Sequence, residues 1–307
     1  MIFSVTVLGC NSAIPTLTRN PSAHLLNANE RFFLFDCAEG TQLQLRRYKI
    51  RFQRISRIFI SHLHGDHYYG LIGLLTSFHL LGRKDPLDLY GHPLLKQILD
   101  IQLEASQTRL IYPIRFHEIG TGYELLHEDD ILTVHSFPVI HSVPTCGFIV
   151  REKEKERKIR KDKIARLNIP VEAMPGLKRG MDFTDSMGHI HLNKELTIDP
   201  PRPRSYVYCG DTSYTESIIP YIKDCNLLYH EATFMQDMVA SAHEKKHSTA
   251  AEAATIALKA GAGKLLIGHY SARYDNLQPL LEEAKKIFPE TYLAEEGKTY
   301  KIPDSLF

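Results

Sequence analysis

Residues 59–71, FISHLHGDHYYGL, place His62, His64, Asp66 and His67 within six positions, directly after an apolar run. A single histidine is more often structural than functional, but imidazole and carboxylate groups are also donors that suit zinc. Three histidines and a carboxylate at the end of one β-like segment therefore predict a metal site. The spacing of His62 and His64 differs from that of Asp66 and His67, and two ligand pairs at one turn favour two metal ions over one.

HLHGDH resembles the HxHxDH motif of the metallo-β-lactamase superfamily, and this resemblance implies further site residues at the ends of strands. Four polar candidates for them each follow a short apolar segment. They are Asp36 in LFDCAEG, His141 in VIHSVPTCGF, Asp211 in VYCGDTS and His269 in LLIGHYS. Each is weak evidence alone, because a polar residue after a strand is common. Together they are what a rim of converging strand ends requires. None of the candidate ligands is a cysteine, which favours a hydrolytic metal site over a structural zinc site.

HLHGDH and these candidates occur in the order expected in the metallo-β-lactamase superfamily. HxHxDH, in place of HxExDH, separates the chain from the flavo-diiron oxidoreductases of that superfamily. The resemblance implies an α/β fold with four layers, αββα, and two Zn²⁺ per subunit, with Mn²⁺ or Fe²⁺ as alternative metals. It also implies a ligand set: His62, His64 and His141 for one zinc, Asp66, His67 and His269 for the other, Asp211 as the bridge, and Asp36 as a supporting residue.

A narrower resemblance, to the short form of the ribonuclease Z family, runs from end to end of the chain. Its segments are GCNSAIPTLTRNPSAHLL, FFLFDCAEGTQLQL (Ala38 stands where glycine is usual), HLHGDHYYGLIGLL, HEATF, KKHSTA, LLIGHYSARY and TYLAEEGKTYKI. This resemblance implies a zinc-dependent endoribonuclease that removes the 3′ trailer from precursor tRNA. Because water is the nucleophile, the tRNA would keep a 3′-hydroxyl and the trailer would carry a 5′-phosphate. The family also implies a homodimer.

Three residues are candidates for proton transfer and its support. His247 either begins the alanine-rich helix, with Ser248 or Thr249 as its cap, or approaches the scissile phosphate as the corresponding family histidine does. In the second role it would protonate the leaving 3′-oxygen, which requires a pKa near the working pH. Glu231 in HEAT either orients His247 or faces solvent, and the neighbouring His230 is expected to be structural. Asp66 is expected to serve as both ligand and proton acceptor.

A charge-rich segment interrupts the pattern of strands and helices. Residues 151–166 hold nine cations and four acids, a net charge of +5. Such a run is usually a solvated face, but the family resemblance implies a tRNA-binding arm at 151–195, inserted into a single domain that spans 1–307. The RNA-binding candidates are Arg157, Lys158, Arg160, Lys161, Lys178 and Arg179. NIPVEAMPGLKRG lacks the GPxxG spacing usual at the tip of this arm.

Composition agrees with a globular protein. The chain has 307 residues, 43% of them hydrophobic and 24% charged, with a net charge of +1. No run approaches the roughly 18 apolar residues of a membrane helix. Five scattered cysteines without a CxxC pair fit a reducing cytoplasm. The overall charge alone does not indicate a nucleic-acid partner.

Strand-like and helix-like segments alternate in both halves and predict two sheets covered by helices. Strands are expected at 3–9, 23–29, 31–37 and 54–61 in the first half, and at 205–211, 226–233 and 264–269 in the second. The longest predicted helix, 64–82, follows the first histidine pair.

Two other functions fit parts of the sequence. A general metallo-phosphodiesterase that acts on small diesters would use the same metals but would not need the basic segment. A non-catalytic tRNA-binding module with a structural metal would need the basic segment but no open, water-bearing metal position.

Overall fold

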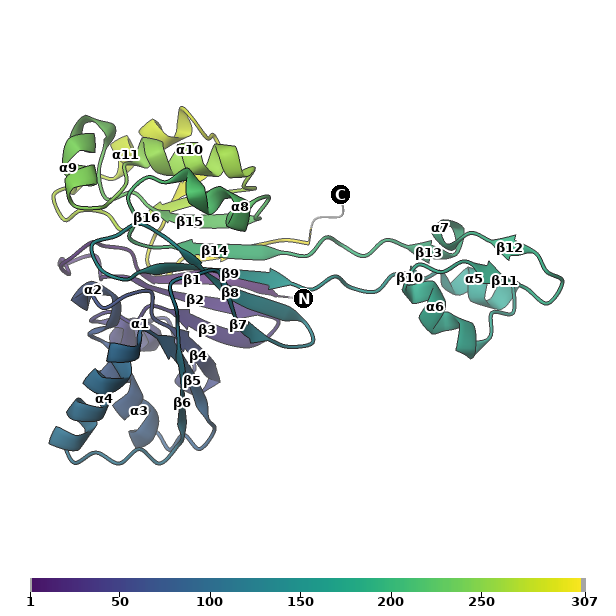
Figure 1. The fold of residues 1–307 in the computed structure, drawn as a ribbon, viewed down its shortest axis with the longest axis horizontal. Helices are drawn as coiled ribbons and strands as arrows, with labels where there is room; N and C mark the ends of the chain where they lie inside the picture. The colour runs from purple at the N-terminus through teal and green to yellow at the C-terminus, as the bar shows by residue number, and fades with distance from the viewer. Residues whose placement is uncertain (1, 305–307) are drawn as a thin grey trace. The chain divides into compact units, whose positions relative to one another are not determined.

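The structure, a computed structural model, describes residues 2–304. It divides into two compact units (Figure 1), which we call the core unit and the inserted unit. The core unit comprises the chain up to Arg151 together with Ser205–Ile302, and the inserted unit comprises Glu152–Arg204 and the segment from Pro303. Among residues 2–304, no helix is long and apolar enough to cross a membrane.

Two seven-stranded sheets form the centre of the core unit. The first has the order β18-β1-β2-β3-β4-β5-β6 and the second β17-β16-β15-β14-β9-β8-β7. Strands of the first sheet are β1 (Phe3–Gly9), β2 (Ala23–Ala28), β3 (Arg31–Phe35), β4 (Ile55–Phe59), β5 (Leu87–Gly91), β6 (Ile114–Glu118) and β18 (Thr299–Lys301). Strands of the second are β7 (Glu124–Glu128), β8 (Leu132–Pro138), β9 (Cys146–Glu152), β14 (Ser205–Cys209), β15 (Leu227–Glu231), β16 (Leu265–Gly268) and β17 (Thr291–Leu293).

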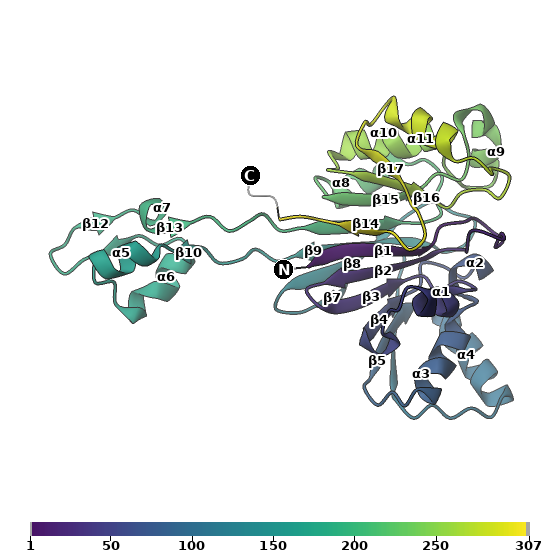
Figure 2. The same ribbon diagram turned by 180° about the vertical axis from the view of Figure 1, so that it is seen from behind.

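Helices cover the outer face of each sheet, as Figures 1 and 2 show from opposite sides. The helices of the first half are α1 (Thr41–Arg47), α2 (Gly65–Tyr68), α3 (Leu71–Leu80), α4 (Pro93–Ala105) and the 3-10 helix η1 (Phe52–Arg54). Those of the second half are α8 (Ile219–Ile222), α9 (Val239–Glu244), α10 (Ala250–Ala260), α11 (Gln278–Lys285), η3 (Glu216–Ile218) and η4 (Gln236–Met238). The four-layer αββα arrangement predicted from the sequence is confirmed.

Aromatic side chains fill the space between the two sheets. Phe35 and Phe59 from the first sheet pack against Phe148 from the second, with ring centroids 5.6 Å apart in both pairs. All three side chains are fully buried. Burial of side chains of this size supplies much of the hydrophobic stabilisation of the fold, so the sheets form one rigid support for the loops at their edges.

The predicted helix 64–82 is interrupted at Tyr69 and Gly70, between α2 and α3. The Gly70 amide donates to the Cys37 carbonyl at 3.0 Å, and a Cβ at Gly70 would lie 2.0 Å from the Ala38 carbonyl oxygen. The chain after β3 therefore packs against the backbone of Gly70, which leaves room only for glycine. This close approach divides the predicted helix and makes α2 a single turn.

The inserted unit has secondary structure and an apolar cluster of its own. Its elements are β10 (Lys158–Ile159), α5 (Lys161–Arg166), η2 (Val171–Ala173), α6 (Met174–Lys178), β11 (Phe183–Thr184), β12 (Ile190–His191), α7 (Asn193–Leu196) and β13 (Thr197–Ile198). Ile169, Leu177, Phe183 and Leu196 are buried against one another. The segment is thus a small folded unit that extends to Arg204, in place of a solvated loop.

Candidate metal centre

Five of the seven residues predicted as metal ligands follow strands: His62 and His64 come after β4, and His141, Asp211 and His269 come after β8, β14 and β16. The other two, Asp66 and His67, lie in α2. The ligand atoms of all seven residues form two clusters that share Asp211, and within each cluster these atoms lie within 4.8 Å of one another. The first cluster is His62, His64, His141 and Asp211, and the second is Asp66, His67, Asp211 and His269.

Distances within the first cluster match one coordination sphere. His64 Nδ1 lies 3.1 Å from both His62 Nε2 and His141 Nε2. Asp211 Oδ2 lies 3.6 Å from the same two Nε2 atoms. A tetrahedral zinc with bonds of about 2.0–2.1 Å separates its ligand atoms by about 3.3 Å. The four side chains therefore fit a tetrahedral cation.

The second cluster has similar dimensions. Asp211 Oδ1 lies 3.2 Å from His67 Nε2 and 3.1 Å from His269 Nε2. Asp66 Oδ2 lies 3.4 Å from His269 Nε2 and 3.7 Å from His67 Nε2. The two oxygens of Asp211 thus face different clusters, which is the arrangement of a carboxylate that bridges two cations.

Asp36 determines which ring nitrogen of two ligand histidines carries a proton. His67 Nδ1 donates to Asp36 Oδ2 at 2.6 Å. The Ser61 hydroxyl donates to the same oxygen at 2.9 Å, so it accepts from His62 Nδ1 at 3.0 Å. In a neutral imidazole the second nitrogen is then an unprotonated acceptor. In their neutral forms, His62 and His67 would therefore present Nε2 lone pairs to the clusters. In the metal-free protein burial lowers the pKa of His67, but the charges of Asp211 and Asp36 outweigh burial and raise it well above its ordinary value.

Hydrogen bonds also determine which ring nitrogen of His269 and of His141 carries a proton. The Thr233 hydroxyl donates to Glu231 Oε2 at 2.6 Å and so accepts from His269 Nδ1 at 2.9 Å. His141 Nδ1 donates to the Lys246 carbonyl at 2.9 Å. Hydrogen bonds of this kind orient metal-binding histidines and set their tautomer.

The Nε2 atoms face carboxylate oxygens, and each such pair of atoms requires a proton or a metal cation between them. His67 Nε2 and Asp211 Oδ1 are buried, and neither has a hydrogen-bond partner among residues 2–304. Burial lowers the pKa of His62 and of His141, which keeps both imidazoles in the neutral form that binds metals. The residues present therefore fit a two-metal site.

His247 and Glu231 form a hydrogen-bonded pair beside these clusters. His247 Nδ1 donates to Glu231 Oε1 at 2.8 Å, and the ring centroid of His247 lies 5.3 Å from that of His141. Burial lowers the pKa of His247, but the charge and the hydrogen bond of Glu231 outweigh burial and raise it to about 9. Glu231 is fully buried and also accepts from the Thr212 amide at 2.8 Å, so it does not face solvent.

One of the two cap residues expected from the sequence, Thr249, caps the alanine-rich helix α10, and His247 lies before that helix. Thr249 forms a capping box with Glu252. The Ser248 hydroxyl donates instead to the Thr212 carbonyl at 2.7 Å. The side chain of His247 therefore takes no part in capping and is held by Glu231. His230 is buried, contacts the Glu231 carbonyl through Nδ1 and lies outside the clusters of ligand atoms found in residues 2–304.

Ser61, Thr233 and Tyr208 contribute to the centre although they were not predicted. Ser61 precedes His62 and Thr233 follows Glu231 by two residues, so proximity to a motif could have indicated both. The Tyr208 hydroxyl donates to Asp36 Oδ2 at 2.7 Å from the opposite sheet. No local signal in the sequence indicates that hydrogen bond.

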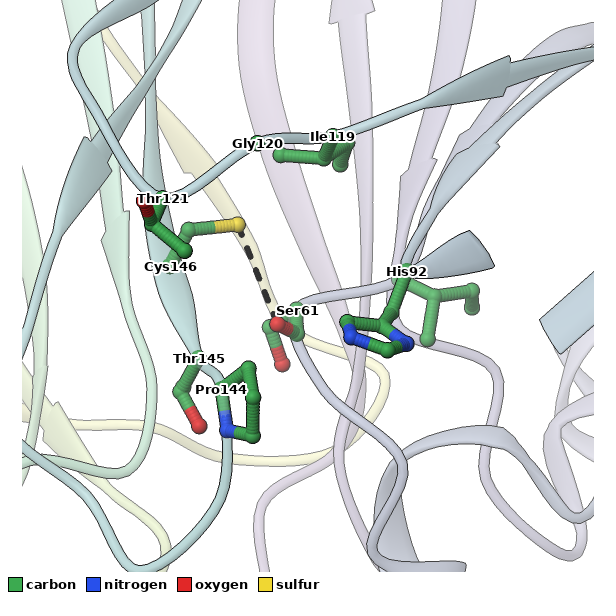
Figure 3. A pocket seen from close by; sticks show the side chains of 9 residues that line it. Ser61, His92, Ile119, Gly120, Thr121, Pro144, Thr145 and Cys146 are labelled. Atoms are coloured by element: carbon green, nitrogen blue, oxygen red, sulfur yellow. Dashed lines mark hydrogen bonds between the residues drawn. The ribbon is translucent and has the colours of Figure 1, made fainter. Parts of the chain in front are cut away.

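A small recess near the motif is lined by residues that include Ser61, His92, Pro144, Thr145 and Cys146 (Figure 3). The Cys146 thiol contacts the Ser61 carbonyl at 3.7 Å. The volume of the recess is about 30 Å³, which is room for about two water molecules. It is too small to receive a nucleobase.

The inserted unit carries a basic groove of about 450 Å³. Of its lining residues, Lys158, Lys161, Lys178 and Glu156 are exposed. Lys178 Nζ lies 3.8 Å from Glu156 Oε2, so one lysine of the groove has an acidic partner. Arg160 and Arg179 are exposed elsewhere on the unit. Arg157 also lines the groove but is half-buried and pairs with Asp199.

Curated relatives match this chain over nearly its full length. Ribonuclease Z from Parabacteroides distasonis is 44% identical over 301 residues, which cover 98% of this chain and 99% of that protein. Ribonuclease Z from Cytophaga hutchinsonii is 41% identical over 308 residues, with coverages of 100% and 98%. A family model described as Anti-Pycsar protein Apyc1 matches residues 3–112.

Solved structures with the same fold include the short form of human tRNase Z. It superposes with a TM-score of 0.70 at 28% identity and covers 98% of this chain and 99% of its own. The metallo-β-lactamase fold protein YhfI from Bacillus subtilis superposes with a TM-score of 0.68 at 22% identity, with coverages of 97% and 98%. At that identity, the second match supports the fold alone.

Proposed function

The chain belongs to the ribonuclease Z family, and from this membership we propose that it is an endoribonuclease that removes the 3′ trailer from precursor tRNA. The observation that carries the proposal is the pair of ligand clusters that share Asp211, in a chain similar to named ribonucleases Z over nearly its whole length. Hydrolysis by water would leave a 3′-hydroxyl on the tRNA and a 5′-phosphate on the trailer.

We assign two Zn²⁺ to the centre, with Mn²⁺ or Fe²⁺ as alternatives that accept similar donors. One would be held by His62, His64 and His141, the other by Asp66, His67 and His269, and Asp211 would contact both. When bound, such a metal pair supplies a water of lowered pKa and offsets charge on the phosphoryl oxygens.

His247 is assigned to protonate the leaving 3′-oxygen. Its Nδ1 is bound to Glu231, so Nε2 is the nitrogen left to face substrate. The pKa of about 9 describes the protein without metals, and two nearby cations would favour the neutral form and lower it towards neutral pH. Glu231 fixes the orientation of the ring and stabilises its protonated state.

Asp66 is assigned to accept the proton of the attacking water. Its Oδ2 accepts from the Ala13 amide at 2.8 Å, so the loop after β1 holds the carboxylate at the second cluster. Asp66 would thereby combine a ligand role with a proton-acceptor role.

The basic groove of the inserted unit is assigned to tRNA phosphates. Lys158, Lys161 and Lys178 line the groove and are exposed. Arg160 and Arg179, which are exposed outside the groove, add further positive charge to the inserted unit. Binding of this kind is independent of sequence and weakens with salt. Arg157 pairs with Asp199 and donates to Thr197 Oγ1 at 2.7 Å, which supports a role in shaping the groove more than direct binding of RNA.

We also propose a homodimer, in which the arm of one subunit presents tRNA to the active site of the other, and a cytoplasmic location. All five cysteines are free and buried, as expected in a reducing compartment.

The test is cleavage of a 3′-extended precursor tRNA by the wild type and by His247→Ala, with bis(p-nitrophenyl) phosphate alongside. We expect tRNA cleavage to fall about 10²–10⁴-fold in the variant. Hydrolysis of the small diester should fall much less, because p-nitrophenolate leaves without a proton. If the wild type hydrolyses only the small diester, the general phosphodiesterase is correct and the tRNA assignment is wrong.

A further inference from the structure

Asp36 is a buried carboxylate on which both metal clusters depend. It supports His67 of the second cluster directly and His62 of the first cluster through Ser61. Its φ of 55° lies in the left-handed region, which a residue other than glycine adopts only when its surroundings hold it there. The orientation of this carboxylate therefore sets the orientation of one ligand in each cluster.

Four hydrogen bonds hold the Asp36 carboxylate, and one comes from the opposite sheet. Oδ1 accepts from the Ser61 amide at 2.8 Å. Oδ2 accepts from Ser61 Oγ, from His67 Nδ1 and, at 2.7 Å, from the Tyr208 hydroxyl. Asp36 follows β3 in the first sheet, whereas Tyr208 lies in β14 of the second. The other donors belong to the motif segment itself.

We propose that Tyr208 is a positioning residue for the metal centre, acting through Asp36 on His67 and, via Ser61, on His62. The inference rests on one part of the proposed function, the binding of metal by the two clusters, and does not depend on the substrate. β14 also leads directly to Asp211, so one strand fixes the bridging ligand and the support of two further ligands. Loss of a group that hydrogen-bonds the metal ligands directly, as Asp36 does, typically weakens metal binding about 10–100-fold. The Tyr208 hydroxyl lies one hydrogen bond further out, so its loss should have an effect near the lower end of that range.

Tyr229 provides a matched control. It lies in β15 beside β14, its ring stacks on that of Tyr208 with centroids 5.1 Å apart, and it is equally buried. Its hydroxyl, unlike that of Tyr208, has no hydrogen-bond partner within residues 2–304. Tyr208→Phe and Tyr229→Phe therefore remove the same atom from the same environment, with and without a hydrogen bond to Asp36.

The experiment measures stepwise Zn²⁺ affinity by competition with a chelator, for the wild type and both variants. We expect Tyr208→Phe to weaken zinc binding about 10-fold, more at the second cluster than at the first, and Tyr229→Phe to stay within about twofold of the wild type. Equal affinities for Tyr208→Phe and the wild type would overturn the inference, and so would equal losses in both variants. A wild type that binds no zinc would instead remove the metal centre on which the proposed function depends.

A double-mutant cycle separates action through Asp36 from general packing. In an Asp36→Asn background, Tyr208→Phe should cause little further loss, because the carboxylate that it supports is gone. If the two substitutions instead weakened zinc binding independently, so that their effects added in full, Tyr208 would not act through Asp36. If Tyr208→Phe does not fold, fluorotyrosine at 208 and at 229 provides the same comparison: only the substitution at 208 should change zinc affinity, and no change at 208 would overturn the proposal.

Discussion

Asp211 is the residue whose loss should damage the centre most. Its two oxygens face different clusters, and its side chain is almost fully buried. Asp66, the other carboxylate in the clusters, belongs only to the second one, so it cannot replace Asp211 at both. Under the proposed assignment, metal binding at both clusters would therefore depend on Asp211.

Asp211→Asn should reduce tRNA cleavage and small-diester hydrolysis together, each by at least about 100-fold. The amide keeps the shape but loses the charge that offsets two cations. Metal content by elemental analysis should fall below that of the wild type. Full metal content with unchanged activity on both substrates would show that Asp211 does not bridge.

At the scale of elements, β2 contains a histidine that should make the fold sensitive to acid. His24 is fully buried, with Nδ1 2.8 Å from the Tyr206 hydroxyl, and burial lowers its pKa to about 3. The unfolded chain has an ordinary histidine pKa of about 6.5. As the pH falls, the unfolded state therefore binds a proton before the folded state does.

The contribution of neutral His24 to the free energy of unfolding should accordingly be present in full above about pH 6.5, and it should be lost as the pH falls towards 3. Between about pH 6.5 and 5 this single group should reduce the free energy of unfolding by about 2 kcal/mol. The asparagine of His24→Asn cannot take up a proton. Between these two pH values, the free energy of unfolding of the metal-free variant should therefore fall by about 2 kcal/mol less than that of the metal-free wild type. Urea unfolding at both pH values measures the difference, and equal losses would contradict the assignment to His24.

Gly70 makes the break between α2 and α3. Gly70→Ala should destabilise the protein by about 1–3 kcal/mol or more, because the new Cβ would meet the Ala38 carbonyl oxygen of a backbone that cannot move aside. Gly122→Ala is the control, since a Cβ there meets nothing within 4 Å. Denaturant unfolding of both variants tests the close approach. If the two variants are equally stable, the packing at Gly70 does not constrain the fold.

At the scale of the whole molecule, the proposed function assigns tRNA binding to the inserted unit and cleavage to the core unit. Its groove holds exposed lysines, whereas the ligand clusters belong entirely to the core unit. Under this assignment, a small diester would need only the clusters, whereas a tRNA would need both the clusters and the groove. The salt dependence of the two reactions should therefore differ.

Replacing Lys158, Lys161 and Lys178 together by Gln should raise the KM for precursor tRNA and reduce its dependence on salt. The slope of log affinity against log salt should fall by about 2–3, because each phosphate that is no longer neutralised lowers it by roughly one. Hydrolysis of bis(p-nitrophenyl) phosphate should not change.

The matched control replaces Lys84, Lys223 and Lys286, three exposed lysines of the core unit, by Gln. It removes the same charge without altering the groove. Equal effects of the two triple variants would show that overall charge, and not the groove, attracts the tRNA.

The sequence by itself determined the αββα class, the residues of the metal motif and most of the strands. These features depend on local patterns: apolar runs form strands, and His62 to His67 lie within one turn of chain. Family resemblance then supplied the distant partners His141, Asp211 and His269, each after an apolar run. The spacing of residues alone could not have paired them.

Only the tertiary structure decided how the centre is held. It shows which nitrogen of each histidine faces the clusters, the break at Gly70, the buried pair of His247 and Glu231, and the hydrogen bond from Tyr208 to Asp36. That hydrogen bond joins residues 172 positions apart in the chain. The physical reason is that hydrogen-bond partners of a buried group are set by which strands pack face to face, and local sequence does not specify that packing.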